Sequence, residues 1–540
     1  MTRTQLGQAL RLGLAAWTAF AVATALGIEH AFWASMPVWV VAQPWRGVVF
    51  ERALWRLLGT LIGGGIGLVL LTLSPTPWVT AVVMAALLAL GGALTHLWQG
   101  VRNYLPMMTA LTIGVVVIPA LLDPSGGFDL AMDRLACTFI GGVSVALIVG
   151  LFTPKADSAG FRAEGAALAQ RFPEVARLLL DTRVPTTRKD EVVAEVIHLG
   201  AELETKARLV AAGSREGYRR MAALDAILAA GLALLEAATE AARNFPTREA
   251  AQRLLSDEPG TGPLPETGPL PRLSRSLAAL GAAIDELQST APSGRDLPRL
   301  APPANPTLAL RGAVVAALAS FAGSAMQILV GGFAMELTAF SMAIFALVMG
   351  SLPQPKLIAP KMAVGVVIGA VTGAAYRIGL QPHLTGWLDL VITILPFIAV
   401  GAIARAYPRT AIYALDYNMC FMLASQAGAA PALTPDVIQS AIAMTVGTLA
   451  IVVCYVALPR PGPALIGRTE ARLAADLELI AKRSEPISAQ RWTAIWGRRV
   501  VTLAIELEKA GEALPRRVLR LASAGHAAID NRKISAPRSR

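Results

Sequence analysis

Long apolar runs, separated by short polar loops, fill two blocks of the sequence. In the first block, residues 9–153, the runs are 9–28, 31–43, 57–73, 78–98, 104–122 and 134–152. In the second block, residues 308–458, they are 308–330, 333–352, 362–380, 384–404, 410–427 and 437–458. A helix needs about 20 apolar residues to cross a bilayer. The pattern predicts an all-α, polytopic membrane protein with eleven or twelve spans, because the run 31–43 is short and stands next to Pro44.

Two polar segments follow these blocks. Residues 155–307 hold 19 Lys/Arg and 20 Asp/Glu, and apolar residues recur with a helical period in 191–210 and 218–242. They predict a helical cytoplasmic insert that ends in a Pro/Gly-rich linker. Residues 460–540 predict a helical tail over 468–483, 490–514 and 516–529. We therefore expect a first membrane half at 1–154, the insert at 155–307, a second membrane half at 308–459 and the tail at 460–540.

The composition excludes soluble and disordered proteins. Hydrophobic residues make up 54% of the chain and charged residues 16%, and the mean hydropathy is +0.54, whereas soluble domains carry about 25% charged residues. Cys137, Cys420 and Cys454 all lie inside apolar runs, so they cannot form a disulfide framework. The tail supplies most of the net charge of +11. We expect it to pack on the insert or to contact anionic lipid, and no nucleic-acid-binding module is recognisable.

Positive residues are distributed unevenly between the two sides of the expected membrane. With the N-terminus inside, thirteen Lys/Arg fall at inner ends and loops, and only Arg134 and Arg377 fall at outer ends. By the positive-inside rule, both termini and both polar segments are cytoplasmic in a bacterial inner membrane. The first run is long for a signal peptide and is followed at once by further spans, so we interpret it as a retained helix.

The two membrane blocks resemble each other. Arg56 aligns with Lys361, Gly64 with Gly369 and Gly142 with Gly447, and Asn103-Tyr104 has a possible counterpart in Asp416-Tyr417. Six helices per copy give both copies the same orientation, which makes this a parallel repeat. Chance similarity between glycine-rich helices is the alternative. Duplicated halves favour a transporter whose site lies between them.

Residues 33–67 contain the most distinctive pattern. A tryptophan leads the second run, a Gln-Pro pair ends it, and a glycine series marks the third run; the residues are Trp33, Gln43, Pro44, Gly59, Thr60, Gly63 and Gly67. Glycines at every fourth position share one helix face, where another backbone can approach closely. The face therefore serves helix packing or lines a substrate path.

This pattern resembles the fusaric acid resistance (FUSC) family, which belongs with the aromatic acid exporters. The resemblance extends in layout over essentially the whole chain, since that family also has six helices, a helical insert and a second membrane half. It implies efflux of aromatic or other hydrophobic carboxylic acids across a bacterial inner membrane, often beside a periplasmic adaptor protein. A distant relation to the plant malate channels implies an anion channel as the alternative.

Ionisable residues at membrane depth are costly and are candidate functional groups. Asp416, beside Tyr417, pairs with Arg405 or Arg409, or else belongs to a proton or substrate site. Glu336 is solvated at the interface or binds protons. Arg134 and Arg377 hold a substrate carboxylate or pair with Asp133 or Asp389. Arg52 and Arg56 anchor the chain at the inner surface or form a vestibule that attracts anions.

Enzyme, metal and cofactor signatures are absent from the sequence. There is no Walker A loop, and the five histidines lack metal-ligand spacing. We therefore expect a transporter without cofactors that exports organic, chiefly aromatic, acids with the proton gradient as its driver. An anion channel and a membrane-anchored scaffold protein are the alternatives. Expected partners are membrane lipid, the small organic acid substrate, a periplasmic adaptor and further copies of the chain, but not nucleic acid.

Overall fold

The computed structural model describes residues 2–529, apart from residues 44, 75, 99, 155–156, 244, 257–267, 292–293, 295, 302–305, 353–354, 458–463, 483–487, 511–517, 519–520 and 522–523. Pro44 and most of the Pro/Gly linker thus lie outside the described residues. All regular elements in the described ranges are helices. The chain forms two compact units, Met1–Lys155 with Ala304–Arg460, and Ala156–Pro303 with Pro461–Arg540.

The first unit contains the apolar runs of both blocks. Its first half consists of α1 (Arg3–Ala25), the 3-10 helix η1 (Ala31–Ser35) with α2 (Met36–Val41), α3 (Arg46–Leu73), α4 (Pro77–Leu97), α5 (Tyr104–Val117) and α6 (Gly127–Ser144), which continues as the π-helical turn η4 (Val145–Gly150). Its second half consists of α12 (Pro306–Val330), α13 (Phe333–Gly350), α14 (Pro355–Gly379), α15 (Trp387–Ala406), α16 (Ala411–Ser425) and α17 (Thr434–Ala457). Each predicted run corresponds to one of these segments.

Three segments of the first unit are too short to cross a bilayer as straight helices. The α2 segment has 6 residues, α5 has 14 and α16 has 15, which at 1.5 Å per residue gives about 20 Å for the longer two. Every residue of η1, which precedes α2, is buried, and so are eleven of the 14 residues of α5. Nine other helices of this unit are long and apolar enough to span a membrane. Large apolar side chains are exposed along several of these longer helices, as expected for lipid-facing surfaces.

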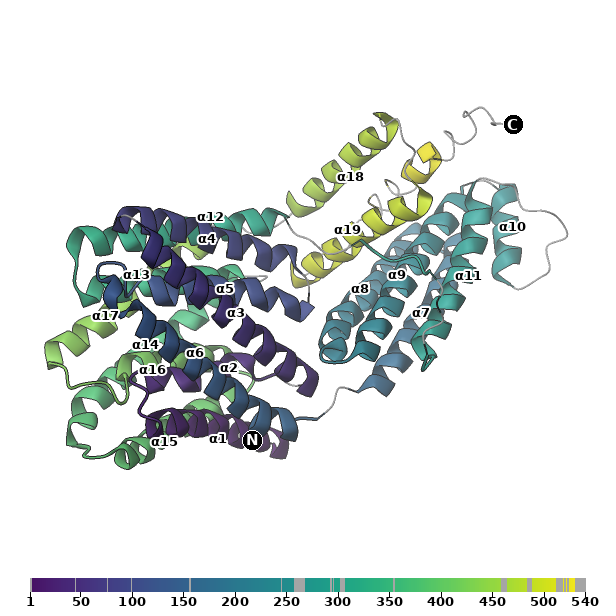
Figure 1. The fold of residues 1–540 in the computed structure, drawn as a ribbon. Helices are drawn as coiled ribbons and strands as arrows, with labels where there is room; N and C mark the ends of the chain where they lie inside the picture. The colour runs from purple at the N-terminus through teal and green to yellow at the C-terminus, as the bar shows by residue number, and fades with distance from the viewer. Residues whose placement is uncertain are drawn as a thin grey trace. The chain divides into compact units, whose positions relative to one another are not determined.

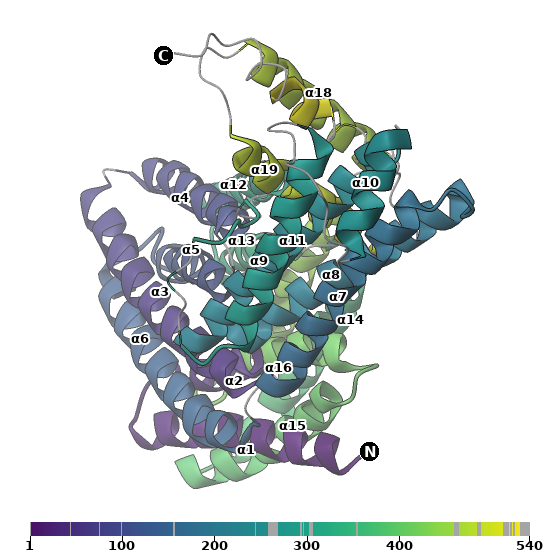
Figure 2. The ribbon, with the colours of Figure 1, turned by 90° about the vertical axis from the view of Figure 1, so that its right-hand side faces the viewer.

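Corresponding helices of the two halves have corresponding packing partners. In the first half α3 packs on α5, and in the second half α14 packs on α16. Between the halves, α4 packs on α12 at one edge of the unit and α1 packs on α15 at the opposite edge (Figures 1 and 2). This exchange pattern is what a parallel repeat would produce, although the repeat itself stays a prediction.

Glycines set the spacing of the two equivalent helix pairs. A Cβ on Gly63 would clash with the carbonyl oxygen of Thr109 on α5, and one on Gly59 would come within 3.0 Å of the Leu105 carbonyl oxygen. On α14, a Cβ on Gly365 or Gly369 would meet the carbonyl oxygens of Tyr413 or Tyr417 on α16 in the same way. Backbone therefore contacts backbone on the face that the glycine spacing indicated.

If the two halves are a repeat, the packing favours a different alignment from the one made from the sequence. Gly63 and Gly369 both meet a carbonyl oxygen of the neighbouring short helix, whereas Gly64 faces open space. In that register Arg56 would align with Met362 in place of Lys361, and Thr109 in place of Tyr104 would align with Tyr417. Single glycines in apolar helices are weak alignment markers, since only the face that meets a neighbour identifies the equivalent position.

The second unit is a helical bundle. It contains α7 (Ser158–Leu180), α8 (Thr186–Ala211), α9 (Arg215–Ala241), α10 (Phe245–Leu255), α11 (Pro269–Gln288), α18 (Ala464–Lys482) and α19 (Ala489–Ala510). By length and composition α9 is a tenth candidate span, but 78% of its apolar window is buried inside this unit, against 33–50% for the other nine. Its many buried alanines and leucines pack against α7, α8 and α11. We therefore interpret α9 as the central helix of the bundle.

Buried ion pairs hold the tail in this bundle. Arg498 on α19 donates to both carboxylate oxygens of Glu204 on α8, at 2.6 and 2.7 Å, and to Asp225 on α9 at 3.2 Å. Its Nε donates to the carbonyl oxygen of Ala301, shortly before α12 begins. Nearby, burial raises the pKa of the Asp476 carboxyl, an effect that the adjacent Arg499 opposes. The tail therefore packs on the insert, as one of the two sequence hypotheses expected.

Candidate functional site

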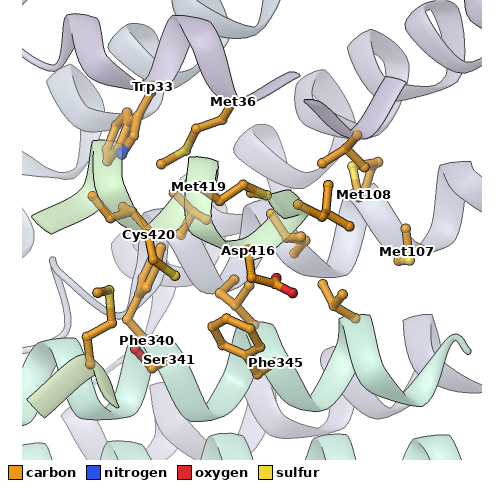
Figure 3. A pocket seen from close by; sticks show the side chains of 18 of the residues that line it. Trp33, Met36, Met107, Met108, Phe340, Ser341, Phe345, Asp416, Met419 and Cys420 are labelled. Atoms are coloured by element: carbon orange, nitrogen blue, oxygen red, sulfur yellow. The ribbon is translucent and has the colours of Figure 1, made fainter. Parts of the chain in front are cut away.

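A cavity lies between the two halves of the first unit. The short segments η1–α2, α5 and α16 line it together with α13, and single residues come from α3, α6 and α17. The volume of the cavity is about 90 Å³. Trp33 lies at one end and Met107 and Met108 lie at the other, with Asp416 between them (Figure 3).

The lining is apolar and rich in methionine. Five methionines face the cavity, and the aromatic side chains come from η1 and α13; these residues are Met36, Met107, Met108, Met419, Met444, Trp33, Phe340 and Phe345. Methionine adapts to irregular shapes and makes favourable contacts with aromatic rings. Such a wall suits a flat apolar molecule of variable outline.

Arg56 brings a buried positive charge to this wall. It stands in the third turn of α3 and is 3% exposed. Its Nη1 donates to the Tyr104 hydroxyl at 3.2 Å and lies 3.2 Å from Sδ of Met108. Both of these partners are neutral groups on α5, and no described carboxylate forms an ion pair with Arg56. Its charge is therefore available to an anion in the cavity.

Arg134 brings a second positive charge from α6. It is 5% exposed, and its guanidinium carbon lies 5.0 Å from the centre of the Trp33 ring. Neither pairing considered from the sequence is present, because Asp133 bonds to His30 and Asp389 accepts from Thr385. Among the described residues, Arg134 has neither a hydrogen-bond partner nor an ion-pair partner. A buried cation without an ion-pair partner is costly, so Arg134 is a candidate binding residue.

Asp416 is the acid of the cavity. It is 4% exposed, and its Oδ2 is buried without a hydrogen bond from any described residue. The nearest opposing charge is Arg405, but the two form no ion pair within 4 Å, and Arg405 donates instead to the carbonyl oxygen of Ala411. The sequence hypothesis of a pair with Arg405 or Arg409 is therefore wrong for the described structure. The carboxyl group is left facing the cavity.

The charged residues interrupt the correspondence of the two halves. In the register of the helix pairs, Asp416 takes the place of Met108, and Arg56 takes the place of Met362. In that register the first half has an arginine where the second has a methionine, and the second half has an aspartate where the first has a methionine. Since packing alone would not require these charges, the asymmetry makes the cavity the candidate functional site.

The other four candidate residues do not line the cavity. Arg52 donates to the carbonyl oxygen of Val40, and its guanidinium carbon lies 5.5 Å from the Tyr104 ring centre, one helical turn from Arg56. Arg377 bonds to Gln426 and to the carbonyl oxygen of Ala430 beyond the end of α16. Tyr417 stacks near Phe421, and Glu336 stands half-buried in the first turn of α13.

Trp33 and the methionines are site residues that the sequence did not single out. Trp33 belonged to the distinctive pattern of residues 33–67, but nothing in its spacing indicated a cavity.

Among the described residues, Glu29, His30 and Asp133 form the one cluster whose potential metal-ligand atoms lie within 4.8 Å of one another. Within it, Nδ1 of His30 lies 2.8 Å from the Asp133 carboxylate.

Comparison with known proteins identifies the family. The model of the fusaric acid resistance protein family matches residues 5–260 and 268–539. An uncharacterized transporter of Gluconobacter oxydans is 29% identical over 157 residues, which are 27% of this chain and 21% of that protein. The chain thus aligns with about a fifth of the length of that relative. The family match extends over nearly the whole chain, which belongs to the fusaric acid resistance protein family and has the architecture of a multi-pass membrane transporter.

Proposed function

We propose that this protein exports aromatic or other hydrophobic carboxylic acids across a bacterial inner membrane, with the proton gradient as the driver. The observation that carries the proposal is the pair of buried guanidinium groups, Arg56 and Arg134, in an otherwise apolar cavity between the two halves. A carboxylate would pair with one or both, and guanidinium groups bind carboxylates through two parallel hydrogen bonds. The rest of the substrate would pack on methionine and aromatic side chains.

The net charge of the cavity supports an anionic substrate. With Asp416 ionised, two guanidinium groups oppose one carboxylate, so a single bound anion would neutralise the site. A neutral, filled site is far cheaper to bury than an empty charged one. An uncharged analogue of the same shape would leave the guanidinium groups unpaired, and we expect it to bind weakly.

Arg52 and Arg405 support an entry path on the cytoplasmic side. Arg52 lies one turn before Arg56 on α3, and Arg405 lies in the last turn of α15, close enough to Arg52 for their charges to interact. In the topology expected from the positive-inside rule, with both termini inside, this is the cytoplasmic end of the unit. Clustered positive charge there would raise the local concentration of organic anions.

Asp416 is the proposed proton carrier. It is the acid that lines the cavity, and its unpartnered oxygen can accept a proton without breaking an existing hydrogen bond. Uptake of a proton by Asp416 from outside and its release inside would couple export of the anion to the proton gradient. The lining contains no second carboxylate, so proton coupling through this cavity would depend on Asp416.

An anion channel is the second candidate, favoured by the succession of Arg52, Arg56 and Arg134 from α3 to α6. A flux assay with purified protein in liposomes, loaded with a panel of labelled aromatic acids, distinguishes an exporter from a channel. An exporter accumulates substrate against its gradient when a pH gradient is imposed, whereas a channel only dissipates gradients. Failure of every acid to move, with folded protein present, would contradict both.

The Asp416→Asn variant tests the carrier. We expect pH-driven accumulation to stop while exchange of labelled for unlabelled substrate continues, because asparagine resembles the protonated acid. Glu336→Gln is the matched control, since Glu336 lies outside the cavity. Undiminished pH-driven transport by Asp416→Asn would show that protons move by another route.

We also propose a periplasmic adaptor protein and further copies of this chain as partners, with lipid around the first unit.

A further inference from the structure

An aromatic side chain of η1 lines one end of the cavity. Trp33 lines the cavity, is 6% exposed and stands at the end away from Met107 and Met108 (Figure 3). It belongs to η1, which begins shortly after α1 ends. The side chain therefore belongs both to the cavity lining and to the short segment that follows α1.

Two polar groups contact the Trp33 ring system. The His30 ring stacks on it with 4.7 Å between centroids and 16° between planes, while the Arg134 guanidinium carbon lies 5.0 Å from its centre. The two neighbours differ in exposure, since the His30 side chain is 31% exposed and Arg134 is 5% exposed. Trp33 thus contacts both a group that solvent reaches and a group that belongs to the cavity.

His30 is fixed to α6 by a short polar contact. Its Nδ1 lies 2.8 Å from the carboxylate of Asp133, which is itself 24% exposed. Asp133 immediately precedes Arg134 on α6. Of these two adjacent residues, the first contacts His30 and the second contacts the Trp33 ring. The Cys137 thiol, one turn further on, donates to the backbone carbonyl oxygen of His30 at 3.4 Å. Trp33 is held by contacts that a small movement of η1 against α6 would break together.

The backbone around Trp33 suits such a movement. The segment η1 is a five-residue 3-10 helix, a form whose hydrogen bonds are poorer than those of an α-helix. It follows a loop in which Gly27 has φ = 72°, a conformation that glycine adopts without strain. Its displacement would not require a long helix to unwind.

We propose that Trp33 is the gate that closes the cavity at the α1/η1 end, and that the His30–Asp133 contact is the latch that keeps it closed. When the latch opens, Trp33 leaves its place beside Arg134, so the cavity opens and the anion site loosens in one step. The place of this step in an export cycle rests on the proposed function, whereas the closure of the cavity does not.

Cys420 is a native reporter of access to the cavity. It lines the cavity and is fully buried, so a charged, membrane-impermeant thiol reagent reaches it only through an opening. The reagent is added to right-side-out and to inside-out vesicles without substrate, and the labelling rate of each cysteine is measured by peptide mass spectrometry. We expect Trp33→Ala and His30→Ala to raise the Cys420 rate at least tenfold from one face only.

Trp39→Ala is the matched control. Trp39 lies on α2, is 1% exposed and does not line the cavity, so its loss removes similar packing without opening the end of the cavity. Asp133→Ala, which removes the latch and keeps Trp33, should act in the same direction as His30→Ala. If Trp33→Ala does not fold, His30→Ala and Asp133→Ala carry the test.

Three outcomes would overturn the gate: no acceleration in the folded variants, equal acceleration from both faces, or equal acceleration in Trp39→Ala. A separate arm adds an aromatic acid to the wild-type protein. Protection of Cys420 by that acid supports the proposed function. Its absence, with the gate variants behaving as expected, contradicts the substrate assignment and leaves the gate standing.

Discussion

Arg134 and Asp416 are buried ionisable side chains that face one cavity from different halves of the first unit. Neither has an ion-pair partner among the described residues, and the Oδ2 atom of Asp416 has no hydrogen bond. Unpartnered charge of this kind destabilises a fold, because desolvation is not compensated. Its presence in a cavity rather than in tight packing is best explained by a ligand that completes the site.

Substitution of Arg134 should weaken the binding of organic anions. Hydrogen bonds to charged groups contribute about 1.5–3 kcal/mol, so Arg134→Gln should lower affinity for an aromatic acid about 10- to 150-fold. Affinity for the corresponding uncharged amide should change little. The measurement is calorimetric or fluorescence titration of purified protein with both ligands.

Arg377→Gln is the control for this substitution. Arg377 bonds to Gln426 beyond the cavity, so its loss should leave anion affinity unchanged. Equal losses in the two variants, or an equal loss for acid and amide in Arg134→Gln, would mean that Arg134 stabilises the fold and does not bind the carboxylate.

At this scale the sequence predicts which residue types matter better than where they point. Asp416, Arg56 and Arg134 were recognisable because charges in apolar runs are rare. Arg52 and Arg377 carry the same signal, yet neither lines the cavity, because Arg52 bonds to the carbonyl oxygen of Val40 and Arg377 bonds to Gln426. Trp33 and the methionines carry no such signal, since an apolar side chain that lines a cavity has the same sequence pattern as one that packs in a core.

The helix pairs α3–α5 and α14–α16 are the elements that bring these residues together. Glycine faces on α3 and α14 let the short, central helices approach at backbone distance. Asp416 and Met108 therefore project from closely held helices toward the cavity. Close glycine packing fixes the position of the site more firmly than larger side chains at this contact would.

A leucine at Gly63 should disrupt the α3–α5 pair. Any side chain there meets the Thr109 carbonyl oxygen and the Thr112 Cβ, and overpacking typically costs about 1–3 kcal/mol. We expect Gly63→Leu to lower the yield of monodisperse protein and its melting temperature. Gly64→Leu, one residue away, faces open space and should leave both near wild type. Similar behaviour of the two variants would argue against the register described for α3.

Helix boundaries in the first unit follow closely from the apolar runs, because hydropathy over a span is a strong signal. The runs 78–98 and 333–352 correspond to α4 (Pro77–Leu97) and α13 (Phe333–Gly350) almost residue for residue. The arrangement of the helices was beyond the sequence. In the sequence, the runs 104–122 and 410–427 resembled ordinary spans. In the structure, the corresponding helices α5 and α16 are short and line the cavity.

For the whole molecule, the assignment of α9 decides how the two units relate to a membrane. Its apolar window is comparable to those of the spans, but α9 also carries Asp225, Glu236 and Glu240, which pair with Arg498, Arg272 or His526 inside the second unit. A helix with three acids paired in this way would be expensive to place in lipid. Its charge pairs and its burial both favour the centre of a bundle.

The topology of the chain follows from that assignment. If α9 does not cross the membrane, residues 200 and 290 lie on the same side. If each of the six apolar runs in each half, the short ones included, carries the chain across, the C-terminus returns to the side of the N-terminus. Paired cytoplasmic and periplasmic reporters fused at 200, 290 and 540 should therefore all score cytoplasmic. Opposite results at 200 and 290 would make α9 a span and would break the equivalence of the two halves. A periplasmic result at all three sites would instead invert the unit, and would turn the arginine-rich end of the cavity outward.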